Sequence, residues 1–76
     1  MADRDKSFRV NQHVQWSWGN GTGKGQIRER FEGDVERTIK GSTITRHGSS
    51  DNPAYLIEQE DGDKVLKLGS ELEKAD

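Results

Sequence analysis

The sequence predicts a small all-β domain, and three observations support this fold class. Polar and apolar residues alternate with a period of two in several short segments, which is typical of strands that bury one face. Clusters of Gly, Asn, Asp and Ser separate these segments and are typical of turns. At 76 residues, the chain is too short for two parts that each bury a core. We therefore expect one domain over residues 8–74, preceded by a disordered, charged tail over residues 1–7.

The hydrophobic core must be small, because 28% of the residues are hydrophobic and 34% are charged. A core of this size supplies roughly 3–5 kcal/mol, and a chain without cysteine has no disulfide to add to it. Self-association is one way to compensate for the small stabilisation that such a core supplies. The bulky residues available for the core are Phe8, Trp16, Trp18, Phe31 and Tyr55.

The absence of cysteine excludes thiolate chemistry, zinc fingers and disulfide scaffolds, and it fits a reducing compartment. The N-terminus is charged from Asp3 onward and lacks the apolar stretch of roughly 7–15 residues that a secretory signal requires. No apolar run approaches the ~18 residues of a membrane helix. We expect a cytoplasmic protein with no membrane partner.

The first strand is predicted at residues 13–18, where alternation places Val14, Trp16 and Trp18 on one face. Residues 19–25 contain four glycines in seven positions, so they are expected to form a loop or a wide hairpin turn rather than a packed strand.

A second strand is predicted at residues 26–32, with Ile27 and Phe31 on one side. Glu29 falls on that same side, which is unfavourable for a buried face. We therefore expect the strand to bend or to leave the core near Glu29.

Residues 35–39 are rich in β-branched side chains and predict a third strand, which we expect to continue past Gly41 to residue 45 through a bulge. Residues 46–53 form a dense cluster of turn formers and predict a long loop.

The last third of the chain predicts a hairpin and a single helical turn. Residues 54–59 form a nearly continuous apolar run, typical of a central strand, and the Asp-Gly pair within residues 60–63 favours a tight turn into a strand at 64–68. Residues 70–74 are too few for a stable helix and are expected to form one helical turn that lays Leu72 against the core.

Five short strands with tight turns predict a small barrel or a two-sheet sandwich. Four segments of the chain stand out by their order and spacing: Val14-Gln15-Trp16, Gly25-Gln26-Ile27, Ser50-Asp51-Asn52-Pro53-Ala54-Tyr55 and Lys67-Leu68-Gly69-Ser70-Glu71-Leu72. In this order and spacing they resemble the hypervirulence-associated Tudor-like domain family.

The resemblance spans about Phe8 to Lys74, and the family comprises small bacterial and fungal proteins. It implies a small SH3-like/Tudor-like barrel of about five antiparallel strands with a short C-terminal helical turn, and no established catalytic activity. The chain departs from the family pattern at Asn11-Gln12, where members often have Gly-Asp, and at Lys67-Leu68, where they often have His-Lys.

The glycine-rich segment does not match a nucleotide-binding motif. In a P-loop reading, Trp18 occupies the position of the first glycine and Gly25 replaces the hydroxyl residue that would hold magnesium. A dinucleotide fingerprint fails because Lys24 and Gln26 stand where its last glycine is needed. No nucleotide cofactor is expected.

The remaining chemistry-bearing residues predict neither a metal site nor an enzyme. His13 and His47 are far apart in the sequence and have no cysteine to complete a site. Asp61 and Asp63 lack the rest of a calcium loop. Residues 47–51 contain the residue types of a hydrolytic triad, but in a loop with nothing to position them.

Two binding sites remain as hypotheses. Trp16, Trp18 and Tyr55, with Phe31, have the ring types of a cage that holds a methylated lysine or arginine by cation–π attraction. The alternative is that these rings fill the core. Trp18 is the best candidate for exposure because it adjoins the glycine segment.

The second hypothesis is a basic surface for single-stranded nucleic acid, made by Lys24, Arg28 and Arg30 together with an exposed aromatic residue on which bases can stack. Lys40 and Arg46 are expected nearby. The alternative is an ordinary polar face that keeps an edge strand soluble. A net charge of -2 is unlike most nucleic-acid-binding domains.

The sequence thus predicts a non-catalytic binding or adaptor module without a cofactor. A protein or peptide partner is favoured over nucleic acid, and a structural or stress-related self-associating protein is the third class. We expect a monomer or a weak homodimer. The candidate ligand-binding residues are Trp16, Trp18, Lys24, Arg28, Arg30 and Tyr55.

Overall fold

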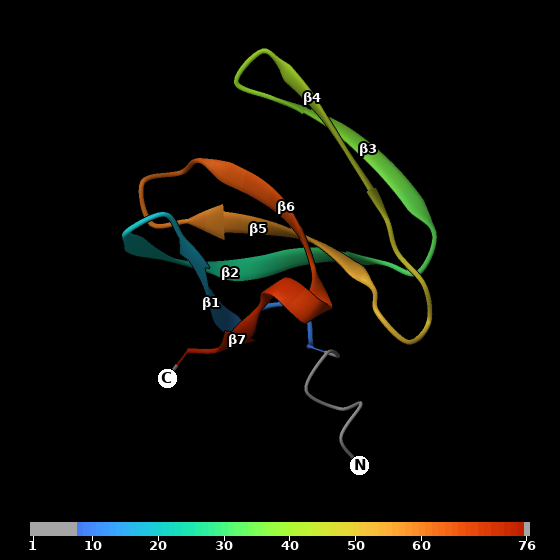
Figure 1. Cartoon of the computed structure of the whole chain (residues 1–76), viewed down its shortest axis with the longest axis horizontal. Helices are drawn as coiled ribbons and strands as arrows, with labels where there is room; N and C mark the ends of the chain where they lie inside the picture. Colours follow the sequence, from blue (N-terminus) through green and yellow to red (C-terminus); the bar gives the residue numbers. More distant parts are fainter. Residues whose placement is uncertain (1–7, 76) are drawn as a thin grey trace.

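The computed structural model describes residues 8–75, and the tail expected over residues 1–7 lies outside that range. The described residues form strands joined by short turns, so the predicted all-β class is confirmed (Figure 1). They contain seven strands rather than about five. In chain order the elements are β1 (His13–Trp18), β2 (Gly21–Phe31), β3 (Asp34–Ile39), β4 (Ser42–His47), β5 (Ala54–Gln59), β6 (Lys64–Leu68), the 3₁₀ helix η2 (Gly69–Glu71) and β7 (Glu73–Lys74).

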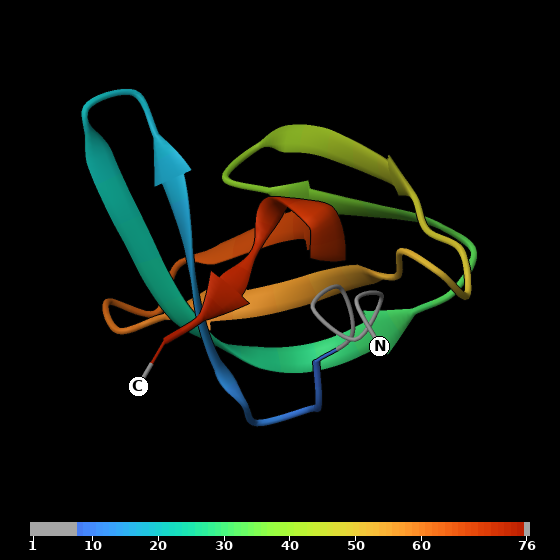
Figure 2. The same cartoon turned by 60° about the horizontal axis from the view of Figure 1, so that its bottom comes forward.

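The strands form two antiparallel sheets. The larger sheet has the order β6-β5-β2-β1-β7, and β3 and β4 form a separate hairpin. This hairpin leaves the sheet after β2, returns to it at β5 and packs against β6 (Figures 1 and 2). In Figure 2, the β1–β2 hairpin extends away from the other strands at the upper left. The molecule therefore has a covered end at β5 and β6 and a projecting end at β1 and β2.

Apolar side chains pack on both faces of the larger sheet. The first core cluster comprises Phe8, Val14, Trp16, Ile27, Tyr55, Ile57 and Leu72. The second lies under the β3–β4 hairpin and comprises Val35, Ala54, Leu56 and Leu66. Because β5 alternates between the two clusters, it needs apolar residues at successive positions. This explains its continuous apolar run and confirms that it is a central strand.

The expected glycine loop is instead the first half of β2. Gly21 pairs with Trp18 and Gly23 with Trp16, so only Gly19 and Asn20 remain for the turn. A Cβ atom at Gly23 would overlap the Trp16 indole, and one at Gly21 would lie 3.1 Å from Trp18 Cζ2. The prediction was wrong because packing outweighs propensity here: the missing side chains make room for the rings.

β2 contains the bend predicted near Glu29. Ile27 pairs with Ile57 and Glu29 with Leu56, which leaves Arg28 as the extra residue of a β-bulge. The bulge reverses the alternation, so Ile27 packs in the first cluster and Phe31 against the second. The prediction that Ile27 and Phe31 share one face is therefore wrong.

The predicted continuation of the third strand past Gly41 is also wrong, because the chain reverses at this point. Lys40 and Gly41 have φ angles of 53° and 79°, and Ile39 pairs with Ser42 across the turn. Positive φ at both central residues is typical of a two-residue type I′ hairpin.

The C-terminal segment follows the prediction with small shifts. The turn before β6 contains Gly62 at φ 92°, and η2 begins one residue earlier than expected. The Leu68 N–H donates a hydrogen bond to Glu71 Oε1 at 2.7 Å, which holds η2 in place. Leu72 is buried as predicted, and the residues after it form β7 and pair with β1.

Candidate functional site

Two of the aromatic residues that were predicted to bind a ligand lie in the core. Trp16 is 5% exposed and Tyr55 is fully buried. The Tyr55 hydroxyl accepts a hydrogen bond from the Phe8 N–H at 2.8 Å, and the two rings meet edge to face at 5.7 Å. In these positions Trp16 and Tyr55 stabilise the fold, and neither can contribute to an exposed aromatic cage.

Trp18, at the end of β1, is by contrast exposed to solvent over 59% of its surface. It borders a shallow groove of about 400 Å³ between the tip of the β1–β2 hairpin and the β5–β6 turn. The groove is lined by Trp18, Thr22, Gly23, Lys24, Gln59, Glu60 and Asp61.

A second groove of about 430 Å³ continues along the polar face of β1 and β2 toward β5. It shares Lys24, Gln59 and Glu60 with the first groove and adds Arg28 and Glu58. We call the two together the β1–β2 groove. Lys24 lines both grooves, whereas Trp18 lines the first and Arg28 the second.

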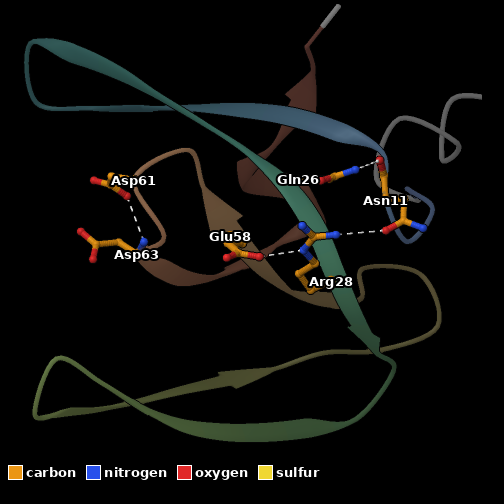
Figure 3. Close-up of polar contacts among 6 residues, drawn as sticks. All are labelled: Asn11, Gln26, Arg28, Glu58, Asp61 and Asp63. Carbon is orange, nitrogen blue, oxygen red and sulfur yellow. Dashed lines mark hydrogen bonds and ion pairs between the residues drawn. The ribbon is translucent and has the colours of Figure 1, made fainter.

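Arg28 is held in a fixed position within this groove, as Figure 3 shows. Its Nε donates to Glu58 Oε1 at 2.9 Å and its Nη1 to Asn11 Oδ1 at 3.3 Å. The Gln26 side chain donates to the Asn11 carbonyl at 2.9 Å. The Glu58 carboxylate pairs with the charge of the Arg28 guanidinium, and the Asn11 contacts connect the chain before β1 to the groove.

The β5–β6 turn forms the opposite wall. The Asp63 N–H donates to Asp61 Oδ1 at 2.9 Å, which fixes the Asp61 carboxylate at the rim (Figure 3). Glu60 precedes it and lines both parts of the groove. The lining residues therefore include two cations, Lys24 and Arg28, against three carboxylates, Glu58, Glu60 and Asp61.

Arg30 is separated from the other predicted cations by the bulge. It pairs with Tyr55 across the ladder, whereas Gln26, before the bulge, pairs with Glu58. Arg30 therefore faces the first core side of the sheet and lines no part of the β1–β2 groove. The pKa of Arg30 is raised above its usual value, chiefly by the hydrogen bond it donates to Glu32.

The other basic neighbours are also paired with carboxylates. Lys40 Nζ lies 2.7 Å from Asp63 Oδ2, and this contact raises the pKa of Lys40. Arg46 Nε lies 3.6 Å from Glu71 Oε1. Apart from Lys24, the cations of the predicted basic surface are therefore divided among separate ion pairs on different parts of the molecule.

The loop expected over residues 46–53 is shorter than predicted, because β4 continues to His47, and residues 49–52 form a turn. Ser49 Oγ accepts a hydrogen bond from the Asn52 N–H at 3.1 Å, and His47 Nδ1 lies 3.0 Å from Asp34 Oδ1 instead of contacting a serine. Over residues 8–75, no three His, Asp or Glu side chains gather closely enough to hold a metal ion. That same range has no helix long and apolar enough to cross a membrane.

The acidic wall of the groove was missed by sequence reasoning. Glu58, Gln59 and Glu60 read as the end of a strand and the start of a turn, and nothing in their spacing indicates a site. They reach the groove because Gln26 pairs with Glu58 and Gly25 with Gln59. The Asp-Gly turn signal was the available clue, since it predicts carboxylates projecting at the end of a hairpin.

Comparison with known proteins gave one family match. The sequence profile of the family described as hypervirulence associated proteins TUDOR domain matches residues 12–72. No curated protein and no solved structure matches the chain. The matched range includes every lining residue of the β1–β2 groove except Ala75.

Proposed function

Because the chain belongs to the family of hypervirulence-associated proteins with a Tudor domain, we propose that it binds a protein or peptide partner in the β1–β2 groove. A Tudor-like domain of this kind is a small binding module. We further propose that the protein has no catalytic activity and that it is cytoplasmic, as expected from the cysteine-free sequence.

The exposure of Trp18 is the observation that carries this proposal. Among the described residues, the large apolar side chains left exposed are Trp18 and Val10, at 59% and 49%. In a chain with so few apolar residues, an exposed indole is a large apolar group that does not stabilise the core. Tryptophan is also enriched where protein interfaces gain most of their binding energy, because its ring buries a large area and its N–H can donate a hydrogen bond.

The charges beside Trp18 favour a protein partner over nucleic acid. Binding to a phosphate backbone depends on an excess of cations. The β1–β2 groove instead has more carboxylates than cations, and Arg28 is already paired with Glu58. A mixed rim around an apolar anchor is typical of protein interfaces.

The experiment begins with peptides selected from a displayed random library against the whole chain, followed by titration of the ¹⁵N-labelled protein. We expect the largest shifts at the Trp18 indole and at the amides of Lys24, Gln59 and Glu60. Trp18→Ala should weaken binding by about tenfold or more, because it removes the central anchor. Val10→Ala is the matched control, since Val10 is exposed but lines neither part of the groove.

Equal binding by the Trp18→Ala and Val10→Ala variants would contradict the proposal. Salt-sensitive shifts at Lys24 and Arg28 with an oligothymidylate, and none with the selected peptides, would assign the groove to nucleic acid instead.

A further inference from the structure

The β3–β4 hairpin is held on the larger sheet by side chains and not by a ladder. Among the described residues, β3 and β4 pair only with each other. The backbone hydrogen bond that closes the base of the hairpin, from the Gly48 N–H to the Gly33 carbonyl, lies within the same segment. β2 already pairs with β5 up to Phe31 and Ala54, so the larger sheet is complete without the hairpin (Figure 1). Lifting the hairpin therefore breaks no ladder of the larger sheet.

The apolar contact beneath the hairpin belongs to one of the two core clusters. Within β3 and β4, Val35 is buried, whereas Ile39 and Ile44 are only half-buried against the second cluster. The first cluster receives no residue from the hairpin. It packs β1, β2 and β5 together on the opposite face of the sheet. Separation of the hairpin consequently uncovers the second cluster and leaves the first one packed.

Three ion pairs fasten the hairpin, and each joins a hairpin cation to a carboxylate of a different part of the chain. They are Arg37 Nη2 to Glu29 Oε1 of β2 at 3.3 Å, Lys40 Nζ to Asp63 Oδ2 before β6 at 2.7 Å, and Arg46 Nε to Glu71 Oε1 of η2 at 3.6 Å. All six side chains are between 32% and 69% exposed, so each pair alone is weak and is screened by salt. Because all three pairs break when the hairpin lifts, the effects of screening on them add up.

A lifted hairpin does not keep its own ladder, because an isolated pair of strands is at best marginally stable in water. Opening is therefore visible in the exchange of the hairpin's backbone amides. The Gly48 N–H donates to the Gly33 carbonyl, and hydrogen-bonded positions recur at every second residue of an antiparallel ladder. The N–H groups of Val35, Arg37 and Ile44 consequently point across the hairpin and are protected from exchange while it is closed.

We propose that the β3–β4 hairpin is a lid that opens as one unit over a larger sheet that stays folded, and that its three ion pairs make the opening depend on ionic strength. Segments held by few buried apolar contacts are the ones that open below the free energy of global unfolding. The open state exposes Leu56 and Leu66 of the second cluster, and high salt increases its population. No hairpin residue lines the β1–β2 groove, so the inference does not depend on the function proposed above.

Native-state hydrogen exchange of the ¹⁵N-labelled chain tests the lid through the amides of Val35, Arg37 and Ile44. The reference amide is Ile27 in the larger sheet, whose N–H donates to the Gln12 carbonyl at 3.0 Å beside the first cluster. After correction for intrinsic rates, the three hairpin amides should exchange at least about tenfold faster than the reference, with one shared dependence on urea that is shallower than that of the reference. Raising NaCl from about 0.02 M to about 0.5 M should speed their exchange by about three- to tenfold, because it screens the ion pairs.

Two variants separate the ion pairs from general effects of salt. Glu29→Gln/Asp63→Asn removes two of the three carboxylates and leaves every hairpin side chain in place. Hairpin exchange at low salt should then be faster by about threefold or more, and its response to NaCl should be smaller. Glu58→Gln is the matched control, because it removes the ion pair with Arg28 inside the larger sheet, which lid opening does not break. In this control, hairpin exchange should stay within about twofold of the parent protein.

Four outcomes would overturn the proposal. The first is hairpin amides that exchange as slowly as the reference, which would mean that the whole molecule unfolds as one unit. The second is exchange that does not depend on urea, as fraying would give. The others are exchange that NaCl does not speed, and a control variant that speeds hairpin exchange as much as the double variant does.

Discussion

A glycine and a tryptophan face each other across β1 and β2, and each restricts the other. Gly23 leaves open the space that the Trp16 indole fills, so the ring can lie flat against the strand and reach the first core cluster. Gly33, in the turn after β2, has no neighbour within 4 Å of the position a Cβ atom would take. The two glycines therefore differ in packing, although propensity scales treat them alike.

Gly23→Ala should lower the free energy of unfolding by about 1–3 kcal/mol, because the added methyl group displaces the Trp16 ring from the core. Gly33→Ala should change it by no more than about 0.5 kcal/mol. Chemical denaturation followed by Trp fluorescence measures both. Equal effects of the two substitutions would show that the Trp16 ring is not in contact with Gly23.

Gly41 tests the reversal between β3 and β4. An alanine there would have to adopt the glycine's φ of 79°, in a region that costs L-residues about 1 kcal/mol or more. Gly41→Ala should therefore destabilise the protein by about that amount, while Gly33→Ala again serves as the control. A stability equal to that of the parent protein would argue for a different turn.

At the scale of elements, β5 has contacts on both of its faces. Tyr55 and Ile57 face the first core cluster, and Ala54 and Leu56 face the second, beneath the β3–β4 hairpin. The sequence predicted this strand well because two covered faces leave a continuous apolar run, which is a strong local signal.

Leu56→Ala should cost about 2–4 kcal/mol if the hairpin covers the second face, close to the cost of Ile57→Ala on the first. Thermal denaturation of the two variants, with Thr43→Ala on the exposed side of β4 as control, provides the comparison. A Leu56→Ala cost as small as that of Thr43→Ala would mean that the hairpin does not bury Leu56.

The elements that the sequence mispredicted share a physical cause. Residues 21–25 lack strand propensity and become a strand because β1 presents rings that need their space. The turn at Lys40 was missed because lysine rarely adopts a positive φ. Both outcomes are decided by contacts with a neighbouring strand, and no local pattern encodes them.

The candidate site was predictable to a similar extent. The exposure of Trp18 follows from its place at the end of a strand, and the sequence analysis anticipated it. The separation of Arg30 from Lys24 depends on a bulge whose effect on side-chain direction appears only when β2 pairs with β5. The acidic wall at Glu60 likewise depends on that long-range pairing.

At the scale of the whole molecule, residues 8–75 expose little apolar surface. Apart from Trp18 and Val10, the large apolar side chains of the described residues are buried or half-buried. Two isolated side chains offer much less area than a stable dimer needs. We therefore expect a monomer rather than a structural, self-associating protein.

Sedimentation equilibrium should give the mass of a single chain over a range of micromolar concentrations. Any weak association at higher concentration should decrease in the Trp18→Ala variant, because Trp18 is the largest exposed ring. A dimer that persists at low micromolar concentration in both variants would instead support the self-associating class.

The β3–β4 hairpin is inserted between two strands that already pair with each other. Phe31, at the end of β2, lies opposite Ala54, at the start of β5, and the Gly48 N–H closes the base of the hairpin by donating to the Gly33 carbonyl at 3.1 Å. The two ends of the hairpin therefore meet, and the pairing of β2 with β5 does not depend on the length of the hairpin. Evolution or an engineer can exchange it as a unit, provided that the replacement still covers Leu56 and Leu66.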